Sequence, residues 1–283
     1  AGRLQARAAL TRRVLGGAAV FAATAVAFGF LLLPLVAIFG RVSPGRLVGQ
    51  LSNPVVADAL VVSLKTSAVA QALVLLVGTP AAYVLATRRF PGRSLAVVLV
   101  ELPLALPPAV AGIGLIAAFG RFGLLGGTLS ALGIRLGLTQ AAVVLAVAFV
   151  AGPFYLRQAI AAFEAVDPDV VAASRTLGAG RGRTFFRVVL PLARSGLAAG
   201  EALAFARGLG EFGATIMFAG SLQGVTQTVP LAIYTAFDVD FTAALAMSAL
   251  LVVVSAALLV ALRLTLQWQP SRPTSRFLFA PSR

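Results

Sequence analysis

The residues that could do chemistry in this chain are few, and most of them are charged. The chain contains no cysteine and no histidine, which excludes disulfides, thiolate nucleophiles, imidazole bases and metal sites built from these ligands. Its one lysine, Lys65, lacks the glycines of a Gly-x-x-x-x-Gly-Lys-Ser/Thr phosphate loop. We therefore expect no catalytic residue, no cofactor and no metal site, and any ATP that drives this protein must bind to another chain.

Three ionisable residues, Glu201, Arg207 and Glu211, stand within an otherwise apolar stretch at residues 196–219. Arg207 and Glu211 are four residues apart, so a helix would place them on one face, where they can pair. Counted from residue 196, Arg207 lies about 16 Å along such a helix, near the middle of a hydrocarbon core about 30 Å thick. Ionisable groups at that depth face a bundle interior or a water-filled path. The sequence leaves open whether the pair holds helices together or belongs to a translocation pathway.

The elements that must position these residues are membrane spans. The chain is 59% hydrophobic and 11% charged, whereas soluble domains carry roughly 25% charged residues. Such a composition places much of the surface in lipid. Six stretches are apolar over about the 20 residues that a spanning helix needs, and they cover residues 18–39, 66–87, 95–119, 139–156, 196–219 and 241–262. We expect an all-α membrane domain over 18–262, a cytoplasmic arm at 1–17 and a cytoplasmic tail at 263–283.

The basic residues orient these spans. The net charge of +14 would suggest nucleic acid in a soluble protein, but membrane proteins gather arginine and lysine in cytoplasmic segments. With the amino terminus inside, 17 of the 23 basic residues fall in inner segments and five in outer ones. This split predicts six spans with both termini in the cytoplasm and no nucleic-acid partner. The outer segment 221–240 is expected to hold a short interfacial or re-entrant helix.

Prolines and glycines mark where spans should bend or pack closely. Pro103, Pro107 and Pro108 must break or kink the third span, and broken helices at membrane depth occur where they are buried or line a cavity. Four glycines make the fifth span thin on parts of its surface, which favours close helix packing over a moving hinge. They are Gly200, Gly208, Gly210 and Gly213.

The inner loop at residues 157–195 has its own pattern. Val170, Ser174 and Leu177 fall at helical spacing, and Gly178 and Gly180 are expected to end that helix. A second short helix should begin near Arg183 and stop before Pro191. The result is an elbow of two helices that suits the groove of a partner protein.

This loop resembles the coupling loop of ABC importer permeases, in which Glu-Ala-Ala is followed after three residues by glycine and later by an apolar-x-Leu-Pro sequence. Gly178 takes the glycine position, and Val189, Leu190 and Pro191 follow at the expected distance. Val171 and Ala172 stand where the glutamate is expected, and Asp169 is the nearest acid. The resemblance implies contacts with an ATPase from Asp169, Ala172, Ala173, Ser174, Leu177, Gly178, Ala179, Gly180, Arg183, Phe186, Leu190 and Pro191.

Three further segments resemble the molybdate and tungstate permeases, which are related to sulfate permeases. They are residues 102–112, 208–221 and 226–234, and the resemblance extends over roughly 63–262. It implies a type I importer permease in a prokaryotic cytoplasmic membrane that moves an oxyanion by alternating access. It also implies a second permease copy, an ATPase subunit and an extracytoplasmic oxyanion-binding protein, in addition to membrane lipid. Pathway or gate residues would be Arg207, Glu211, Phe212, Gly213, Thr215, Pro107 and Pro108.

Two other classes of protein remain as alternatives. An ion-coupled secondary transporter would need internal repeats and ion ligands near the midplane, and the sequence shows no clear inverted repeat. An intramembrane enzyme would need a Ser/Lys or paired-carboxylate site, yet Lys65 lies at a membrane edge. The sequence does not distinguish molybdate from tungstate or sulfate.

Overall fold

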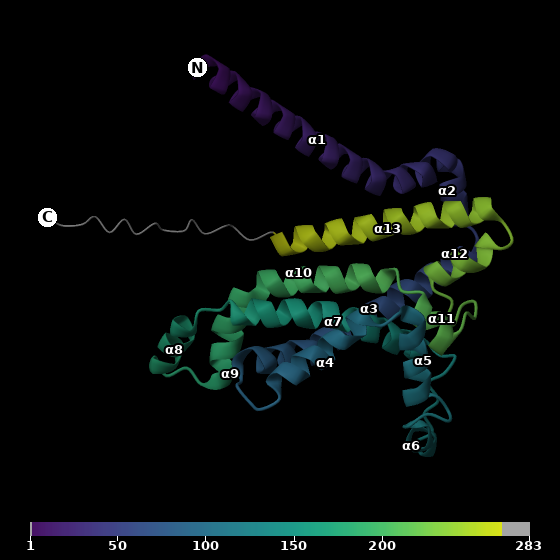
Figure 1. Ribbon diagram of the computed structural model, residues 1–283. Coiled ribbons are helices and arrows are strands. Elements are labelled where there is room, and N and C mark those ends of the chain that lie inside the picture. The colour runs from purple at the N-terminus through teal and green to yellow at the C-terminus, as the bar shows by residue number, and fades with distance from the viewer. Residues whose placement is uncertain (1, 268–283) are drawn as a thin grey trace.

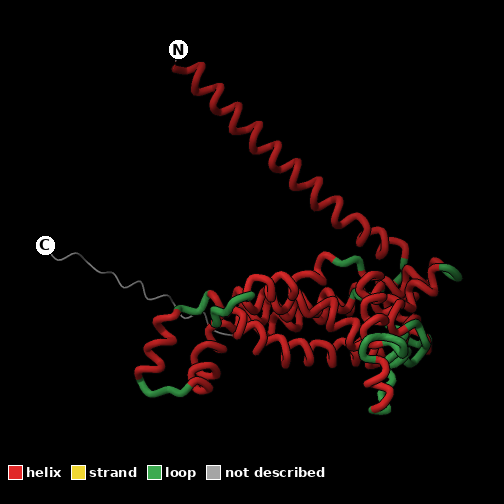
Figure 2. Tube along the Cα trace, turned by 60° about the horizontal axis from the view of Figure 1, so that its bottom comes forward, coloured by secondary structure: helices red, strands yellow, loops and turns green. Residues whose placement is uncertain are grey.

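The computed structural model describes residues 2–267, with the side chains of residues 16–261 and Leu264. Every regular element in this part of the chain is helical (Figure 2). The helices are α1 (Gly2–Arg41), α2 (Pro44–Gln50), α3 (Pro54–Thr87), α4 (Arg93–Ala105), α5 (Pro108–Phe119), α6 (Gly126–Ala131), α7 (Gln140–Glu164), α8 (Pro168–Thr176), α9 (Arg181–Thr184), the π-helix η1 (Phe185–Val189), α10 (Leu190–Leu209), α11 (Gly213–Ala219), α12 (Val229–Phe237) and α13 (Phe241–Gln267).

The membrane-spanning character follows from the length of these helices. Within the described residues, five helices are long and apolar enough to cross a membrane, and a sixth span results if the bent pair α4–α5 is one span. The all-α fold is thus confirmed, and the five to six candidate spans agree with the six that were predicted. The helix boundaries differ from the prediction, since α3 starts twelve residues earlier than residue 66 and contains Lys65. The tail predicted at 263–283 lies mostly outside the described residues.

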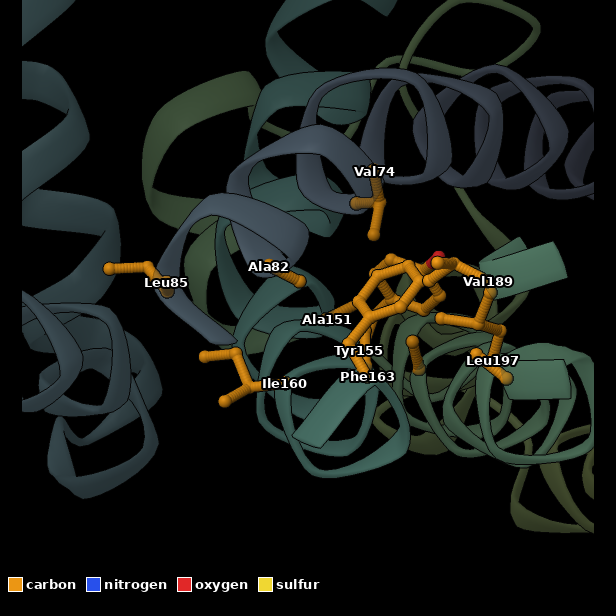
Figure 3. Close-up of a cluster of buried hydrophobic side chains, with 12 residues drawn as sticks. Val74, Ala82, Leu85, Ala151, Tyr155, Ile160, Phe163, Val189 and Leu197 are labelled. Atoms are coloured by element: carbon orange, nitrogen blue, oxygen red, sulfur yellow. The ribbon is translucent and has the colours of Figure 1, made fainter. Parts of the chain in front are cut away.

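The core is a stack of α3, α7 and α10, with α4 against α7 (Figure 1). Tyr155 of α7 lies at its centre, only 1% exposed, among small and aliphatic side chains (Figure 3). Its ring lies over Gly78, where a Cβ atom would be 3.1 Å from the Tyr155 Cδ1 atom. Gly196 and Gly200 of α10 approach α7 in the same way. Small residues permit this close approach, because lipid supplies no hydrophobic force between helices.

The third predicted span is broken, as its prolines predicted. α4 and α5 meet at an angle of 117°, because Leu106 is extended and Pro107 precedes the first turn of α5. α5 therefore turns away from α4 and packs against α11. The break places Pro107 and Pro108 at an exposed corner of the chain.

The fifth predicted span differs in two respects from the sequence prediction. The prediction that a short helix stops before Pro191 was wrong, since α9, η1 and α10 form one helical stretch, Arg181–Leu209. In η1 the Leu190 amide donates to the Phe185 carbonyl, and this wider turn accommodates a proline that has no amide hydrogen to donate. The stretch then ends at Leu209, so Arg207 lies in the last turn of α10 and not at the middle of a helix.

Two helices at the edge complete the fold. Val42, the residue after α1, packs with Ala246 and Ala249 of α13. Among the described residues, nothing buries the most apolar part of α1, within Gly16–Arg41. α12 is the short helix expected in the segment 221–240, and it docks on α3 and α13.

Candidate functional site

The elbow of α8 and α9 is held by backbone capping at Gly178. Gly178 has φ of +84°, a left-handed conformation that favours glycine. Its amide donates to the Arg175 carbonyl at 3.0 Å, and the Ala179 amide donates to the Ser174 carbonyl at 3.1 Å. This pair of bonds is a Schellman cap, so the predicted helix end at Gly178 is confirmed. Gly180 was also predicted to end this helix, but it is instead the N-cap residue of α9.

Side chains also tie the two arms of the elbow together. The hydroxyls of Ser174 and Thr184 lie 3.2 Å apart, and Thr184 is buried. At the start of α8 the Asp167 carboxylate accepts the Asp169 amide at 2.8 Å, which caps that helix end. Sequence reasoning missed both Asp167 and Thr184. The N-cap signal of Asp-Pro-Asp before an apolar stripe could have found Asp167. The contact of Thr184 with Ser174 arises only because the elbow folds back on itself, so no local sequence signal indicates it.

The elbow presents an apolar face that none of the described residues covers. Val170 is 44% exposed, Leu177 is 88% exposed and Phe186 is 67% exposed. Most of the predicted coupling residues lie on the surface of the same elbow, and Ser174, Ala179 and Leu190 are partly buried. The exposed ones are Asp169, Ala172, Ala173, Leu177, Gly178, Gly180, Arg183, Phe186 and Pro191. Exposed apolar surface of this kind marks a place of contact with a partner protein or with a membrane.

A second group of predicted residues surrounds the gap between α10 and α11. Arg207 Nη2 lies 2.9 Å from Glu211 Oε2, so the predicted ion pair forms. The Glu211 side chain is only 1% exposed, whereas that of Arg207 is 30% exposed. The other carboxylate oxygen of Glu211 accepts the Ala214 amide at 2.7 Å. Glu211 thus joins the end of α10 to the start of α11, and Arg207 balances its buried charge.

α5, the second half of the broken span, crosses α11, the short helix that follows α10. A Cβ atom on Gly213 would lie 2.5 Å from the Pro108 Cβ, and one on Gly112 would lie 2.6 Å from the Met217 Cβ. α5 and α11 therefore cross in direct backbone contact, which brings Pro108 and Gly213 together. Phe212 stacks on Tyr234 of α12 at 4.9 Å between ring centroids, and Thr215 is fully buried. Pro107 lies at the corner that precedes this crossing.

Sequence reasoning missed the uncharged polar residues that α3 contributes. Gln71 is buried beside Gly208, where a Cβ atom would be 3.1 Å from the Gln71 Nε2 atom. Among the described residues, no hydrogen-bond partner meets either polar atom of this amide. The Ser63 hydroxyl accepts the Val229 amide at 2.8 Å and anchors the start of α12. Polar side chains inside an apolar span were the available signal, which a search restricted to ionisable groups does not detect.

The two groups of residues lie at opposite ends of the molecule. Figure 1 shows α8 and α9 at one end of the helical stack and α5, α6 and α11 at the other. The helical stretch Arg181–Leu209 connects them directly. Its straight part, α10, has 20 residues and spans about 30 Å at 1.5 Å per residue. The structure thus assembles two distinct candidate sites on one continuous element.

An all-helical bundle with several spanning helices and an exposed elbow agrees with the sequence comparisons. Residues 75–269 match the family described as binding-protein-dependent transport system inner membrane component. The chain belongs to this family. It is 47% identical over 229 residues to the molybdenum transport system permease protein ModB of Mycobacterium tuberculosis, covering 80% of this chain and 86% of that protein.

The chain is also similar to permeases of other transport systems. The sulfate transport system permease protein CysT of Escherichia coli is 36% identical over 263 residues, covering 91% of this chain and 95% of that protein. Among solved structures, a bacterial alginate ABC transporter chain superimposes with a TM-score of 0.70 at 15% identity, covering 90% of this chain and 93% of that one. This last likeness concerns the fold, which is that of an ABC importer permease.

Proposed function

We propose that this chain is the permease subunit of an ATP-driven importer for molybdate-type oxyanions. The observation that carries the proposal is the 47% identity to molybdenum permeases over 86% of their length. The chain is no enzyme in this role, because ATP hydrolysis belongs to a separate ATPase subunit. A binding protein on the outer side delivers the anion.

The geometry supports different roles for the two candidate sites, with ATPase docking at the elbow and gating at the crossing of α5 and α11. The apolar face of Val170, Leu177 and Phe186 would dock on the ATPase. A movement of the elbow would then pass through η1 to α10, since Arg207 at the far end of α10 pairs with Glu211, which binds the Ala214 amide of α11. The crossing of α5 and α11 would open and close in response.

A second copy of the chain completes this proposal. Arg207 is partly exposed, as are Phe212 and Tyr234 next to it, so residues near the break face away from this chain's own core. Two copies related by a twofold axis would place these residues on both sides of a pathway. None of the described residues covers the most apolar part of α1. Lipid or the second copy would therefore cover it.

The test is uptake into proteoliposomes that contain this chain and its ATPase, with the binding protein outside. Uptake of molybdate should require ATP inside and the binding protein outside, and it should be insensitive to ionophores that dissipate proton and sodium gradients. Excess tungstate should compete more strongly than excess sulfate. Uptake that persists without ATP and ceases with an ionophore would identify an ion-coupled secondary transporter instead.

A further inference from the structure

A cavity of about 1060 Å³ lies against the elbow, and the exposed residues Val170, Leu177 and Phe186 do not line it. Its walls come from the end of α3, the start of α4, the end of α7 and the α8–α9 elbow. α8 lines it through Val171, Ala172 and Arg175, whereas Val170 and Leu177 point elsewhere. Because three spanning helices end here, the cavity lies at the level where a membrane presents its headgroups.

The rim of this cavity carries an excess of positive charge. Arg88 and Arg89 follow α3 on one side, and Arg175 and Arg181 belong to the elbow on the other. The single carboxylate in the lining, Glu164, already pairs with Arg93. Among the side chains that the structure describes, no carboxylate lies within ion-pair distance of the four rim arginines. Four guanidinium groups around one opening favour a ligand with a phosphate-like anionic group.

The floor of the cavity is apolar. The rings of Tyr83 and Phe185 pack edge to face with centroids 4.8 Å apart, and those of Tyr83 and Phe163 do so at 5.4 Å. Buried Val189 continues this surface. An inorganic oxyanion would gain nothing from such a floor, whereas a molecule with an anionic head and an apolar body would match both parts of the lining.

We infer that the cavity binds the headgroup of an anionic phospholipid from the cytoplasmic leaflet. The rim arginines hold its phosphate, and the aromatic floor covers the glycerol and the upper part of an acyl chain. Basic pockets between membrane helices bind anionic headgroups on the same principle. The bound lipid joins the elbow to α3 and α4, so it holds the ATPase-docking face in position. The inference rests on the proposed function only in assigning this end of the molecule to the cytoplasmic side.

Native mass spectrometry of the purified full chain tests this site without any transport measurement. Phosphatidylglycerol and phosphatidylcholine with identical acyl chains are titrated separately. We expect tighter binding of phosphatidylglycerol, and a loss of roughly 30-fold in the Arg88→Gln/Arg181→Gln variant, because each arginine near an anionic surface contributes about fivefold. The charge-preserving Arg88→Lys/Arg181→Lys variant should retain most of the binding. The matched control, Arg121→Gln/Arg135→Gln, removes two arginines that flank α6 in the chain and do not line this cavity, and it should bind as the wild type does.

Three results would overturn the inference. One is equal binding of phosphatidylglycerol by the wild type and by a folded Arg88→Gln/Arg181→Gln variant, with folding checked by thermal unfolding. Another is displacement of the lipid by inorganic phosphate at equal concentration, which would assign the cavity to free anions. The third is complete loss of the lipid when the ATPase subunit is added, which would assign the cavity to the protein interface. Retention of phosphatidylglycerol in the complex supports the inference.

Discussion

At the scale of single residues, the Arg207–Glu211 pair places a carboxylate inside the fold beside a partly exposed guanidinium. Glu211 is buried and unable to reach water, so it depends on Arg207 at 2.9 Å and on the Ala214 amide. Replacing Arg207 by methionine leaves a buried carboxylate without its counter-charge, which should lower the free energy of unfolding by about 3 kcal/mol. The Arg207→Met/Glu211→Gln double variant should recover most of that loss, since glutamine can still accept the Ala214 amide.

Transport by the double variant separates packing from a pathway role. We expect it to assemble with the ATPase while uptake stays far below the wild-type rate, because the positive potential of Arg207 is lost from the proposed pathway of a divalent anion. Thermal unfolding and vesicle uptake measure the two effects. Full uptake by the well-assembled double variant would show that the pair only holds helices together. Arg121→Met, which removes an exposed arginine outside both candidate sites, serves as the control.

At the scale of elements, the elbow depends on one backbone conformation. Gly178 has positive φ and open space around its Cα, with no atom within 4 Å of an added Cβ. Gly178→Ala should therefore cost about 1–2 kcal/mol through backbone strain alone. We expect weaker binding of the ATPase to this variant in a pull-down or by interferometry, with the membrane bundle intact. Gly182→Ala, in the adjacent helical turn and equally open, should bind the ATPase normally. Equal binding by both variants would exclude a role for the Gly178 turn.

The crossing of α5 and α11 permits a similar matched comparison. Gly112→Ala would bring a methyl group to 2.6 Å from the Met217 Cβ and 3.0 Å from the Ala214 carbonyl oxygen. Such overpacking should cost about 1–3 kcal/mol. Gly114→Ala, two residues along the same helix, meets nothing within 4 Å and should be neutral or slightly stabilising, since alanine favours helices by up to about 1 kcal/mol. Thermal unfolding in detergent measures both, and an equal shift would contradict the close crossing.

At the scale of the whole molecule, the proposed orientation places the elbow inside and the α5–α7 connection outside. The chain has no cysteine, so single cysteines report accessibility without background. Arg181→Cys should react with a membrane-impermeant maleimide only in inside-out vesicles. Phe122→Cys, at a position that is 95% exposed, should react only in intact cells or right-side-out vesicles. Reversed labelling would overturn the orientation and, with it, the assignment of the elbow to the ATPase.

The sequence alone was sufficient for the features that depend on local composition. Long apolar runs require helices in lipid, because no other open structure satisfies its own backbone there. The prolines at 103, 107 and 108 predicted the broken third span, and Gly178 predicted the end of α8. The spacing of Arg207 and Glu211 predicted their ion pair. The motifs at 102–112, 208–221 and 226–234 also predicted the family correctly.

Only the tertiary structure decided how these features combine. Pro191 continues a helix where local rules predict an end, because a π-turn accommodates the missing amide hydrogen. Glu211 lies in a gap between helices and caps α11, although its spacing from Arg207 suggested one unbroken helix. The contacts of Gly112 with Met217 and of Ser63 with Val229 join residues that are distant in the chain. Such contacts depend on how whole helices pack, and their energies come from surfaces that no local pattern of residues contains.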